Sequence, residues 1–488
     1  MKLQKWLGIS FGAFFIFINC FALFWGYDFV PIASLALVVL YLLFFKFELL
    51  LYLLAFITPL SIPFEDTKIN LGLSIPSEII MILVTLIFFV RLLLDVKMDR
   101  KILHHPITIA ISVYLGWMLF TCFTSEIPLV SFKFFLSKIW FIVSCYFVMV
   151  WFVNKDISKW KKFMSCYLVG LVIVICIATV KLAQIGLFTK DFHWSMHPFY
   201  NDHTAYGAAI ALFIPLLIGF FFLPNTSKFT KLYYSVIFCF LLGGLYFSYC
   251  RAAWLSLIVV VLVFIILKLR IKISWIVVGL GLIAFVFYNF SDDIFYRMGR
   301  NSQDSSNDLG KHIQSISNIS TDASNVERLN RWVSAFGMIE DRPWVGWGPG
   351  TYQFIYAAYQ KPQYETIIST SFGDGGNAHS EFIGPTSETG FVGLATVLAV
   401  MIAALYTGIV SYIRSKRKDL KILSLAASLA LISYYFHGLM NNFLDTDKLS
   451  LPFWATIAII VVVDQLRREE KVAAAREQHG ICDLKILI

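Results

Sequence analysis

Apolar residues fill long stretches of this chain, and short polar segments separate them. Fourteen such stretches can be counted, the second and third being short: 7–25, 29–45, 48–62, 77–94, 106–124, 137–153, 163–182, 204–223, 231–249, 252–268, 273–290, 389–413, 421–438 and 449–466. A helix needs roughly 17–25 apolar residues to cross a bilayer. Because lipid offers no hydrogen-bond partner to the backbone, such stretches must form helices. The pattern predicts an all-α membrane protein, a polytopic bundle of about 12–14 transmembrane helices.

Composition agrees with this class. Hydrophobic residues make up 58% of the chain and charged residues 15%, whereas soluble domains are about 45–50% apolar. No small-residue cleavage pattern follows the first apolar stretch, so we expect that stretch to remain as an anchor. The eight cysteines are scattered without metal-ligand spacing, and most fall within apolar stretches. They are expected to be small buried hydrophobes.

Lysine and arginine gather in alternate loops. The basic loops lie at Lys46, 91–101, 155–162, 228–231, 268–272, 414–418 and 467–471. The loops that are poor in Lys and Arg are 63–76, 125–136, 183–203, the turn at Arg251, 291–388 and 439–448. The positive-inside rule predicts that the first set is cytoplasmic, together with both termini. The net charge of +9 is therefore explained by topology, and no nucleic-acid partner is expected.

The segment 291–388 is predicted to be one large exterior loop. Its first part is polar, but from Val326 the run VERLNRWVSAFGMIEDRPW has helical periodicity. One stripe of that helix would hold Leu329, Trp332, Val333, Phe336 and Ile339. Pro343 and the glycines of WVGWGPG would end it. We expect amphipathic helices here that lie on the outer membrane surface.

The chain then divides into five regions. They are N-terminal transmembrane helices (1–199), core transmembrane helices (200–290), the large periplasmic loop (291–388), C-terminal transmembrane helices (389–466) and a cytoplasmic tail (467–488).

Three cationic residues and a histidine are candidates for chemistry. Arg251, in FSYCRAAWLSL, falls at the outer membrane boundary, where a cation needs a partner or a wet cavity, unless it snorkels to headgroups. In VERLNRW, Arg328 shares a helix face with Trp332, and Arg331 points elsewhere; the alternative is a solvated helix. His379 follows a Gly-rich turn in GDGGNAHSEFIGPTSETG. We expect the turn to place His379 at the mouth of the bundle, where it could act as a general base. The alternative is a surface residue, as a lone histidine in a loop often is.

The exterior loop FHWSMHPFYNDHTAYGAA adds another polar cluster. It contains His193, His197, Asp202 and His203, but their spacing matches no standard zinc motif, so no metal site is predicted. A polar lining near a substrate is the better interpretation. Because a helix follows directly, Asn201 or Asp202 can also serve as its N-cap.

Taken together, these residues indicate one kind of chemistry. Several guanidinium groups at an exterior membrane boundary suit an anionic headgroup, above all a diphosphate, which arginine binds with paired hydrogen bonds. A nearby histidine can deprotonate an incoming hydroxyl. The combination predicts a transferase whose leaving group is a phosphate or diphosphate on a lipid.

The segment from about 200 to 393 resembles the O-antigen ligase and polymerase superfamily, integral-membrane glycosyltransferases of the GT-C type. The resemblance covers somewhat under half the chain. It rests on an ordered set of motifs: NDHTAYGAAIALFIPL, SYCRAAWL, RLNRWVSAFGMIEDRPWVGWGPGTY and AHSEFIGPTSETGFVGL.

This resemblance implies a mechanism and a set of roles. A glycan on polyprenyl (undecaprenyl) diphosphate would be transferred with inversion, without a metal or other cofactor. Arg251 and Arg328 would bind the diphosphate and stabilise its developing charge, and His379 would activate or position the acceptor hydroxyl. Substrate binding would involve Arg331, Asn201, Asp202, His203 and Ser380.

Two positions in the closing motif need comment. The family commonly has Asn where this chain has Ser380, a departure that bears on hydrogen bonding to the acceptor. Glu388 matches the family's acidic residue. We expect it to have a structural role at the start of the next helix.

The leading function hypothesis is an O-antigen ligase of lipopolysaccharide biosynthesis. It would act at the periplasmic face of the bacterial inner membrane, with lipid A–core oligosaccharide as acceptor and membrane lipids around it. An O-antigen polymerase and a protein O-oligosaccharyltransferase would share the donor chemistry. A transporter of lipid-linked sugars is the alternative from another class, but we find no internal repeat of the kind transporters show.

Overall fold

The computed structural model describes most of the chain. The described residues are 14–15, 17–27, 29–66, 71–94, 98–154, 156–186, 194–272, 274–275, 278–279, 281–282, 285, 289, 323–364 and 376–486. The predicted apolar stretches 7–25 and 273–290 lie partly outside these residues, and so does the polar first part of the predicted exterior loop.

Ten helices in the described part are long and apolar enough to cross a membrane. They are α4 (Ser77–Leu94), α6 (Pro106–Phe123), the span Pro128–Val153, α9 (Ile157–Ile185), α10 (His203–Phe222), α11 (Lys228–Ser248), α12 (Arg251–Leu269), α17 (Ile383–Arg414), α18 (Lys418–His437) and α19 (Asp447–Ile486). The span Pro128–Val153 consists of α7 (Pro128–Ile142), the π-helical turn η2 (Val143–Phe147) and α8 (Val148–Val153). This architecture confirms an all-α polytopic membrane protein.

The remaining elements are shorter. Two are apolar helices, α2 (Phe29–Phe45) and α3 (Phe47–Ile57). The others are α5 (Arg100–Leu103), α15 (Ala323–Asp341), α16 (Tyr352–Ile355), the 3-10 turns η1 (Thr58–Leu60), η5 (Tyr356–Tyr359) and η6 (Pro362–Tyr364), and the strands β1 (Ile62–Asp66) and β2 (Leu71–Ile75).

Most helix boundaries agree with the apolar stretches, and α2 and α4 begin and end at the predicted residues. The stretch predicted to begin at 137 is an exception, because its helix already begins at Pro128. Proline is well suited to the first position of a helix. The polar residues Lys133, Ser137 and Lys138 hide this part of the helix from a count of apolar residues.

A β-hairpin was not expected from the sequence. Strands β1 and β2 pair antiparallel, with Ile62 opposite Ile75. They occupy most of the segment predicted as the exterior loop 63–76. Both strands are only five residues long, so their alternation is too brief to stand out beside the long apolar stretches.

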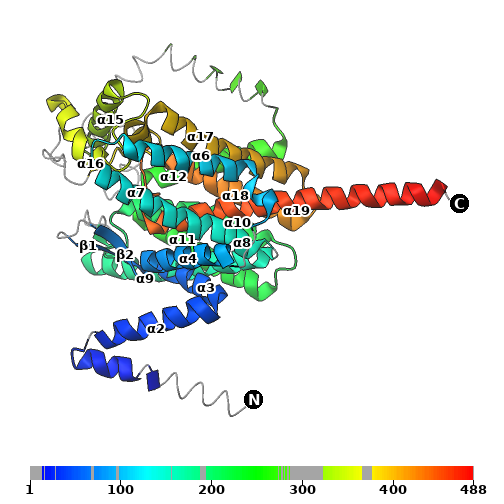
Figure 1. Ribbon diagram of the computed structural model, residues 1–488, viewed down its shortest axis with the longest axis horizontal. Helices are drawn as coiled ribbons and strands as arrows, with labels where there is room; N and C mark the ends of the chain where they lie inside the picture. Colours follow the sequence, from blue (N-terminus) through cyan, green and yellow to red (C-terminus); the bar gives the residue numbers. More distant parts are fainter. Residues whose placement is uncertain are drawn as a thin grey trace.

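The two predicted sets of loops gather at separate ends of the bundle. At one end, the Glu126 backbone N–H donates to the Trp347 carbonyl at 3.0 Å, which joins two loops of the set poor in basic residues. At the other end, the Lys101 ammonium lies 3.0 Å from the Glu469 carboxylate. In Figure 1 the hairpin, α15 and α16 lie at the left of the bundle, and α19 extends from its right. Which end faces the periplasm stays a prediction.

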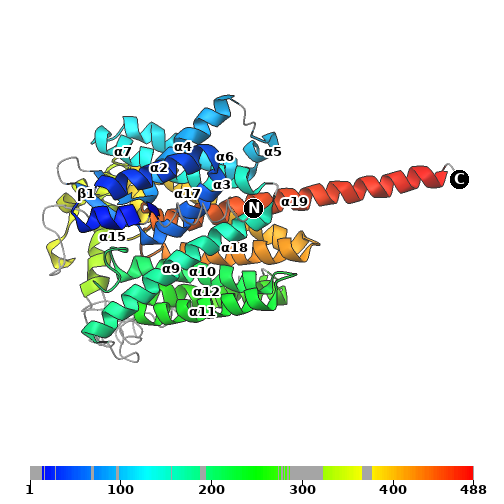
Figure 2. The ribbon, with the colours of Figure 1, turned by 90° about the horizontal axis from the view of Figure 1, so that it is seen from below.

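The centre of the bundle is formed by α19 with α10 and α18. Nearly all of the apolar window of α19, 94%, is buried, against 22% for α12. Figure 2 shows α10 and α12 beside α18, and α18 contacts both of them. A Cβ on Gly219 of α10 would lie 2.5 Å from the Ala426 Cβ of α18. Small residues thus bring these helices close, as is common between transmembrane helices.

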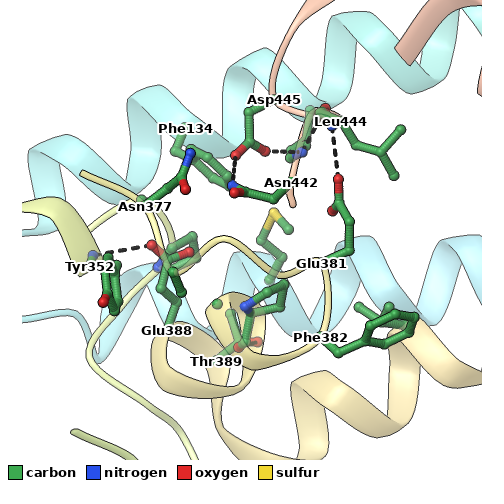
Figure 3. Close-up of a pocket in the computed structure, with 18 of the residues that line it drawn as sticks. Phe134, Tyr352, Asn377, Glu381, Phe382, Glu388, Thr389, Asn442, Leu444 and Asp445 are labelled. Atoms are coloured by element: carbon green, nitrogen blue, oxygen red, sulfur yellow. Dashed lines mark hydrogen bonds and ion pairs between the residues drawn. The ribbon is translucent and has the colours of Figure 1, made fainter. Parts of the chain in front are cut away.

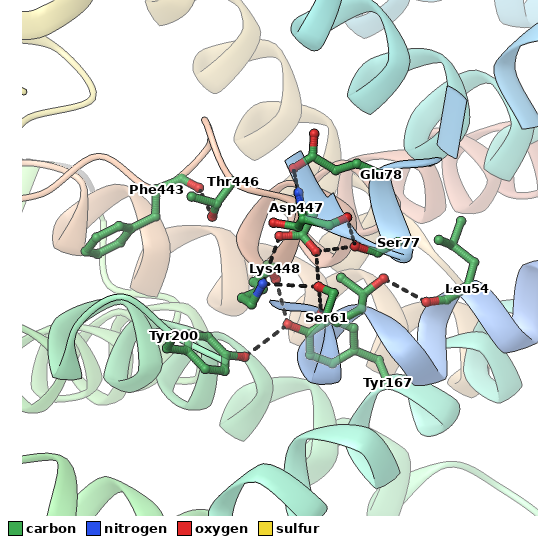
Figure 4. A network of polar contacts seen from close by, with 12 residues as sticks. Leu54, Ser61, Ser77, Glu78, Tyr167, Tyr200, Phe443, Thr446, Asp447 and Lys448 are labelled. Atoms are coloured by element: carbon green, nitrogen blue, oxygen red, sulfur yellow. Dashed lines mark hydrogen bonds and ion pairs between the residues drawn. The ribbon is translucent and has the colours of Figure 1, made fainter. Parts of the chain in front are cut away.

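A buried polar network ties the N-terminal helices to α19 (Figure 4). The Asp447 carboxylate accepts hydrogen bonds from the Ser61 and Ser77 hydroxyls, both at 2.5 Å, and pairs with the Lys448 ammonium at 3.1 Å. The Tyr167 hydroxyl donates to the Lys448 carbonyl at 2.6 Å. Asp447 is fully buried, so this network holds together helices that are distant in sequence.

We therefore expect Asp447→Ala to destabilise the protein by roughly 3–5 kcal/mol, because it leaves the buried Lys448 without its carboxylate. The thermal midpoint of the purified protein in detergent measures the effect. Lys101→Ala is a matched control, since it breaks an ion pair whose side chains are 65% and 54% exposed. That change should cost less than about 1 kcal/mol. Equal midpoints for the two variants would contradict the prediction.

Candidate functional site

The first turns of α10 and α12 lie against each other. Asp202 caps α10, its Oδ1 accepting a hydrogen bond from the Thr204 backbone N–H at 2.7 Å. Cys250 directly precedes Arg251, the first residue of α12. A Cβ on Gly207 would lie 2.6 Å from the Cys250 Cβ. This close packing holds Arg251 beside the capped start of α10.

Helix α15 brings Arg328 to the same place. Its Nε donates to the Met440 carbonyl, in the segment between α18 and α19, at 3.3 Å. Burial raises the pKa of the Cys250 thiol to about 12, and the positive charge of Arg328 acts on that thiol in the opposite sense. Arg328 is therefore near Cys250, the residue before α12, and its grouping with Arg251 stays a prediction.

Arg331 has a different environment. It is buried, and its Nε lies 2.6 Å from the Glu327 carboxylate one turn earlier on α15. Its guanidinium carbon lies 4.2 Å from the centre of the Tyr356 ring. A Cβ on Gly376 would lie 1.4 Å from an Arg331 nitrogen. Arg331 thus packs α15 against η5 and against the segment that leads to His379.

The buried face of α15 differs from the predicted apolar stripe. The residues that pack inward are Glu327, Asn330, Arg331, Ser334, Ala335, Met338 and Ile339. Of the predicted stripe, Ile339 is buried and Phe336 is 50% exposed. The inward face thus mixes polar and apolar residues, and the exposed Phe336 suits a helix at a membrane surface, but that location stays a prediction.

His379 lies in a strained backbone position close to these cations. Its φ of +46° is in the left-handed region, which non-glycine residues seldom adopt. Its backbone N–H donates to the Asn377 Oδ1 at 3.0 Å. Burial lowers the pKa of His379 to about 3, with further lowering by Arg328 and Arg331 and an opposing effect of Asp202. The imidazole is therefore neutral at pH 7, the state in which it can accept a proton.

The glycine-rich segment 344–350 packs against the first part of α17, close to His379 in the sequence. Gly346 and Gly390 both have positive φ, +67° and +72°. A Cβ on Gly346 would lie 2.3 Å from the Glu388 backbone, and a Cβ on Gly390 would lie 2.1 Å from the Trp344 carbonyl oxygen. Only glycine allows the two backbones to approach so closely. These two glycines therefore let the segment 344–350 pack directly against the part of α17 that follows His379.

Three further predicted substrate-binding residues lie near helix starts. The Ser380 hydroxyl accepts hydrogen bonds from the backbone N–H groups of Phe382 and Ile383, at 3.2 and 3.3 Å, and so holds the turn that leads into α17. Asn201 is exposed, and His203 is half-buried as the first residue of α10. Substrate contacts by these three residues stay predictions.

No group of three or more His, Cys, Asp or Glu side chains that could hold a metal occurs in the described part of the chain. His193, from the predicted polar cluster, lies outside it. His197 is described, and its carbonyl accepts a hydrogen bond from the Lys181 ammonium at 2.5 Å.

Glu388 lies just before a break in α17, because two helical segments of α17 meet at a kink at Gly390. Its expected place at the start of a helix thus holds for the second segment, whereas an interaction of its carboxylate with that helix end stays a prediction. Its carboxylate accepts a hydrogen bond from the Tyr352 backbone N–H at 3.1 Å. The side chain therefore ties the segment after the glycines to α17, which is a structural contact of another kind.

A cavity of about 360 Å³ adjoins the His379 segment, between α6, α7, α17, α18 and α19 (Figure 3). We call it the carboxylate cavity, because Glu381, Glu388 and Asp445 contribute to its wall. Lys138 also lines it, paired with Asp445 at 2.6 Å. Glu381 accepts a hydrogen bond from the Leu444 backbone N–H at 3.0 Å, and burial together with the charge of Asp445 raises its pKa.

Sequence reasoning did not select Lys138, Glu381 or Asp445. Lys138 did carry a signal, because an ionisable residue inside an apolar stretch needs a partner and often marks a site. Its partner, Asp445, is 307 residues further along the chain, so the pairing was not visible in one sequence.

The arrangement separates two kinds of chemistry. Arg328 is near enough to His379 to lower its pKa, and a guanidinium group can hold an anion. His379 is neutral and can take a proton from a hydroxyl. The His379 segment also borders a cavity with an acidic and aromatic wall.

Comparison with known proteins found a match to a family model. Residues 236–398 match the family model described as O-antigen ligase, and this region includes Arg251, Arg328 and His379. The match covers about a third of the chain. A search of curated proteins found no match. The family match confirms the resemblance to the O-antigen ligase superfamily and supports an O-antigen ligase- or polymerase-like function for this multi-pass membrane protein.

Proposed function

From the similarity of residues 236–398 to O-antigen ligases, we propose that the protein transfers a glycan from polyprenyl diphosphate to an acceptor hydroxyl at the periplasmic face of the inner membrane. Lipid A–core oligosaccharide is the proposed acceptor. The observation that supports this best is the grouping of Arg328, the start of α12 and His379, which come from segments far apart in the sequence.

The proposed reaction is a single displacement at the anomeric carbon. The acceptor hydroxyl gives its proton to His379, and its oxygen forms a bond to the anomeric carbon. The bond from that carbon to the diphosphate oxygen breaks, and the diphosphate leaves with the electron pair. Arg251 and Arg328 stabilise the negative charge that grows on the leaving oxygen. The anomeric configuration inverts, and His379 later releases its proton to water.

The electrostatics support this order of events. A histidine with a pKa of about 3 is a weak base, and the nearby arginines contribute to that low value. A bound diphosphate brings negative charge beside the same arginines. It should raise the pKa of His379 toward the working pH, where a general base is most effective. The base would thus gain strength only when the donor is in place.

A polymerase or a protein O-oligosaccharyltransferase would use the same donor chemistry with another acceptor. The test is glycan transfer in vitro by the purified protein in detergent, with a polyprenyl-diphosphate glycan and EDTA. Lipid A–core, a second donor molecule and a Ser/Thr-rich peptide are offered separately. We expect product on lipid A–core. Product on another acceptor only would change the acceptor, and translocation of the lipid without any product would exclude the enzyme.

A further inference from the structure

The carboxylate cavity lies beside the proposed catalytic histidine but has a chemistry of its own. Asn377 and Ala378, which precede His379, line it, whereas neither His379 nor any arginine is among its described lining residues. Its volume of about 360 Å³ falls within the range of small-molecule sites. The cavity is therefore a separate compartment next to the reacting atoms.

The charges of the wall disfavour an anionic occupant. Glu381, Glu388 and Asp445 contribute carboxyl groups, and Lys138 is the one cationic lining residue in the described part of the chain. The Lys138 ammonium is already engaged, with the Asp445 carboxylate at 2.6 Å and the Leu444 carbonyl at 2.9 Å. No cation in this wall is left to bind a phosphate, so the diphosphate of the donor belongs on the arginine side.

The wall also holds polar atoms whose hydrogen bonds are not made. The Tyr435 hydroxyl, the Trp454 Nε1 and the Asn442 Oδ1 are buried without a partner among the described residues. All three side chains line the cavity. A buried polar group without a partner costs about 1–3 kcal/mol, so such groups usually have a further partner. The Tyr435 hydroxyl and the Trp454 Nε1 can donate, and the Asn442 Oδ1 can accept. A ligand with several hydroxyl groups needs partners of both kinds.

Aromatic rings complete this wall. Phe134, Tyr352 and Phe453 lie beside the polar groups. Aromatic side chains with a polar end combine an apolar contact surface with a hydrogen bond. Sugar rings present both kinds of surface, with C–H groups on their faces and hydroxyl groups at their edges.

We propose that the carboxylate cavity binds an uncharged, hydroxyl-bearing sugar unit of the acceptor and holds it beside His379. The identification of this sugar as part of the acceptor rests on the proposed function. The binding of a sugar in the cavity does not depend on it. The phosphate-bearing parts of both substrates lie outside the cavity.

The test is a binding experiment without turnover, on the full-length protein in lipid nanodiscs. The probes are the methyl glycosides of glucose, galactose and N-acetylglucosamine, and the 6-phosphates of the same sugars, followed by saturation-transfer NMR. We expect a neutral glycoside to bind and its phosphate to bind at least tenfold more weakly. Tyr435→Phe and Trp454→Phe should each weaken binding about three- to tenfold through one lost hydrogen bond.

These variants carry their own control for folding. Neither the Tyr435 hydroxyl nor the Trp454 Nε1 has a partner in the described protein, so removing either should leave the thermal midpoint unchanged. Trp140→Phe is the matched control, because Trp140 also has a buried, unpartnered Nε1 among the described residues but does not line the cavity. Unchanged binding in both cavity variants, no binding by any neutral glycoside, or tighter binding of the phosphates would overturn the proposal.

The outcomes also separate this proposal from the proposed function. Binding of inorganic pyrophosphate in the same nanodiscs reports on the proposed diphosphate site at Arg251 and Arg328, and should not change in the cavity variants. Sugar binding that depends on Tyr435 and Trp454, without glycan transfer to any acceptor, would keep the sugar site and reject the transferase. Transfer that proceeds with an unchanged acceptor KM in both variants would keep the transferase and reject the sugar site.

Discussion

Replacing His379 with asparagine is expected to lower glycan transfer about 10²–10⁴-fold, the usual contribution of a general base. Asparagine is the informative substitution, because it tolerates the left-handed backbone that His379 adopts at φ +46° and cannot act as a base near neutral pH. The protein should therefore fold normally and still bind pyrophosphate. The measurements are the initial rate of transfer and, separately, the thermal midpoint.

His197→Asn is a suitable control, since that histidine belongs to another loop of the same predicted exterior set, and its backbone carbonyl, which the substitution keeps, accepts the hydrogen bond from Lys181. We expect this control to retain near-normal transfer. Transfer by His379→Asn at the rate of the unmodified protein would remove the proposed base and favour the transporter alternative.

The dependence of the rate on pH should report the same histidine. The neutral imidazole is the active form, and the pKa of His379 in the free protein is about 3. The value of kcat/KM for the donor, which follows the free enzyme, should therefore stay flat as the pH falls from 8 to about 5. The value of kcat follows the donor complex, whose diphosphate raises the pKa, so it should decline at a higher pH. A kcat that declines at a lower pH than kcat/KM would contradict this assignment.

The membrane class and most helix boundaries could be predicted because they depend on local composition. A stretch such as 77–94 must form a spanning helix whatever surrounds it, and α4 occupies those residues. The same reasoning placed the start of α7 too late in the sequence, because Lys133 and Lys138 interrupt the apolar pattern. A lysine within a spanning helix is acceptable only with a partner, and for Lys138 that partner is Asp445 from the other end of the chain.

The alternation of the loops assigns Arg251 and His379 to one membrane face, and this stays a prediction. The inward face of α15 could not be read from the apolar stripe, because it mixes polar and apolar residues. Glu327 and Arg331 satisfy each other there at 2.6 Å, so burial does not require an apolar stripe. The carboxylate cavity was missed altogether, since its wall combines several helices from distant parts of the chain, whose packing one sequence does not specify.

Changing Arg328 to alanine is expected to lower transfer about 10²–10³-fold, the effect of removing one group that stabilises developing charge. The loss should appear in kcat and in pyrophosphate binding. The thermal midpoint should fall less than in Arg331→Ala, because Arg328 is only half-buried. Arg328→Lys should recover only part of the activity, since an ammonium keeps the charge but lacks the paired hydrogen bonds of a guanidinium.

Arg331→Ala provides the comparison on the same helix. Arg331 is buried and paired with the buried Glu327, so its removal leaves a carboxylate without that partner and should cost roughly 3–5 kcal/mol of stability. The two variants thus separate the two arginines: Arg328→Ala should lose catalysis with the smaller loss of stability, and Arg331→Ala should lose stability first. If Arg328→Ala melts early and the stable fraction transfers glycan normally, Arg328 supports the fold, and the anion site would have to rely on Arg251.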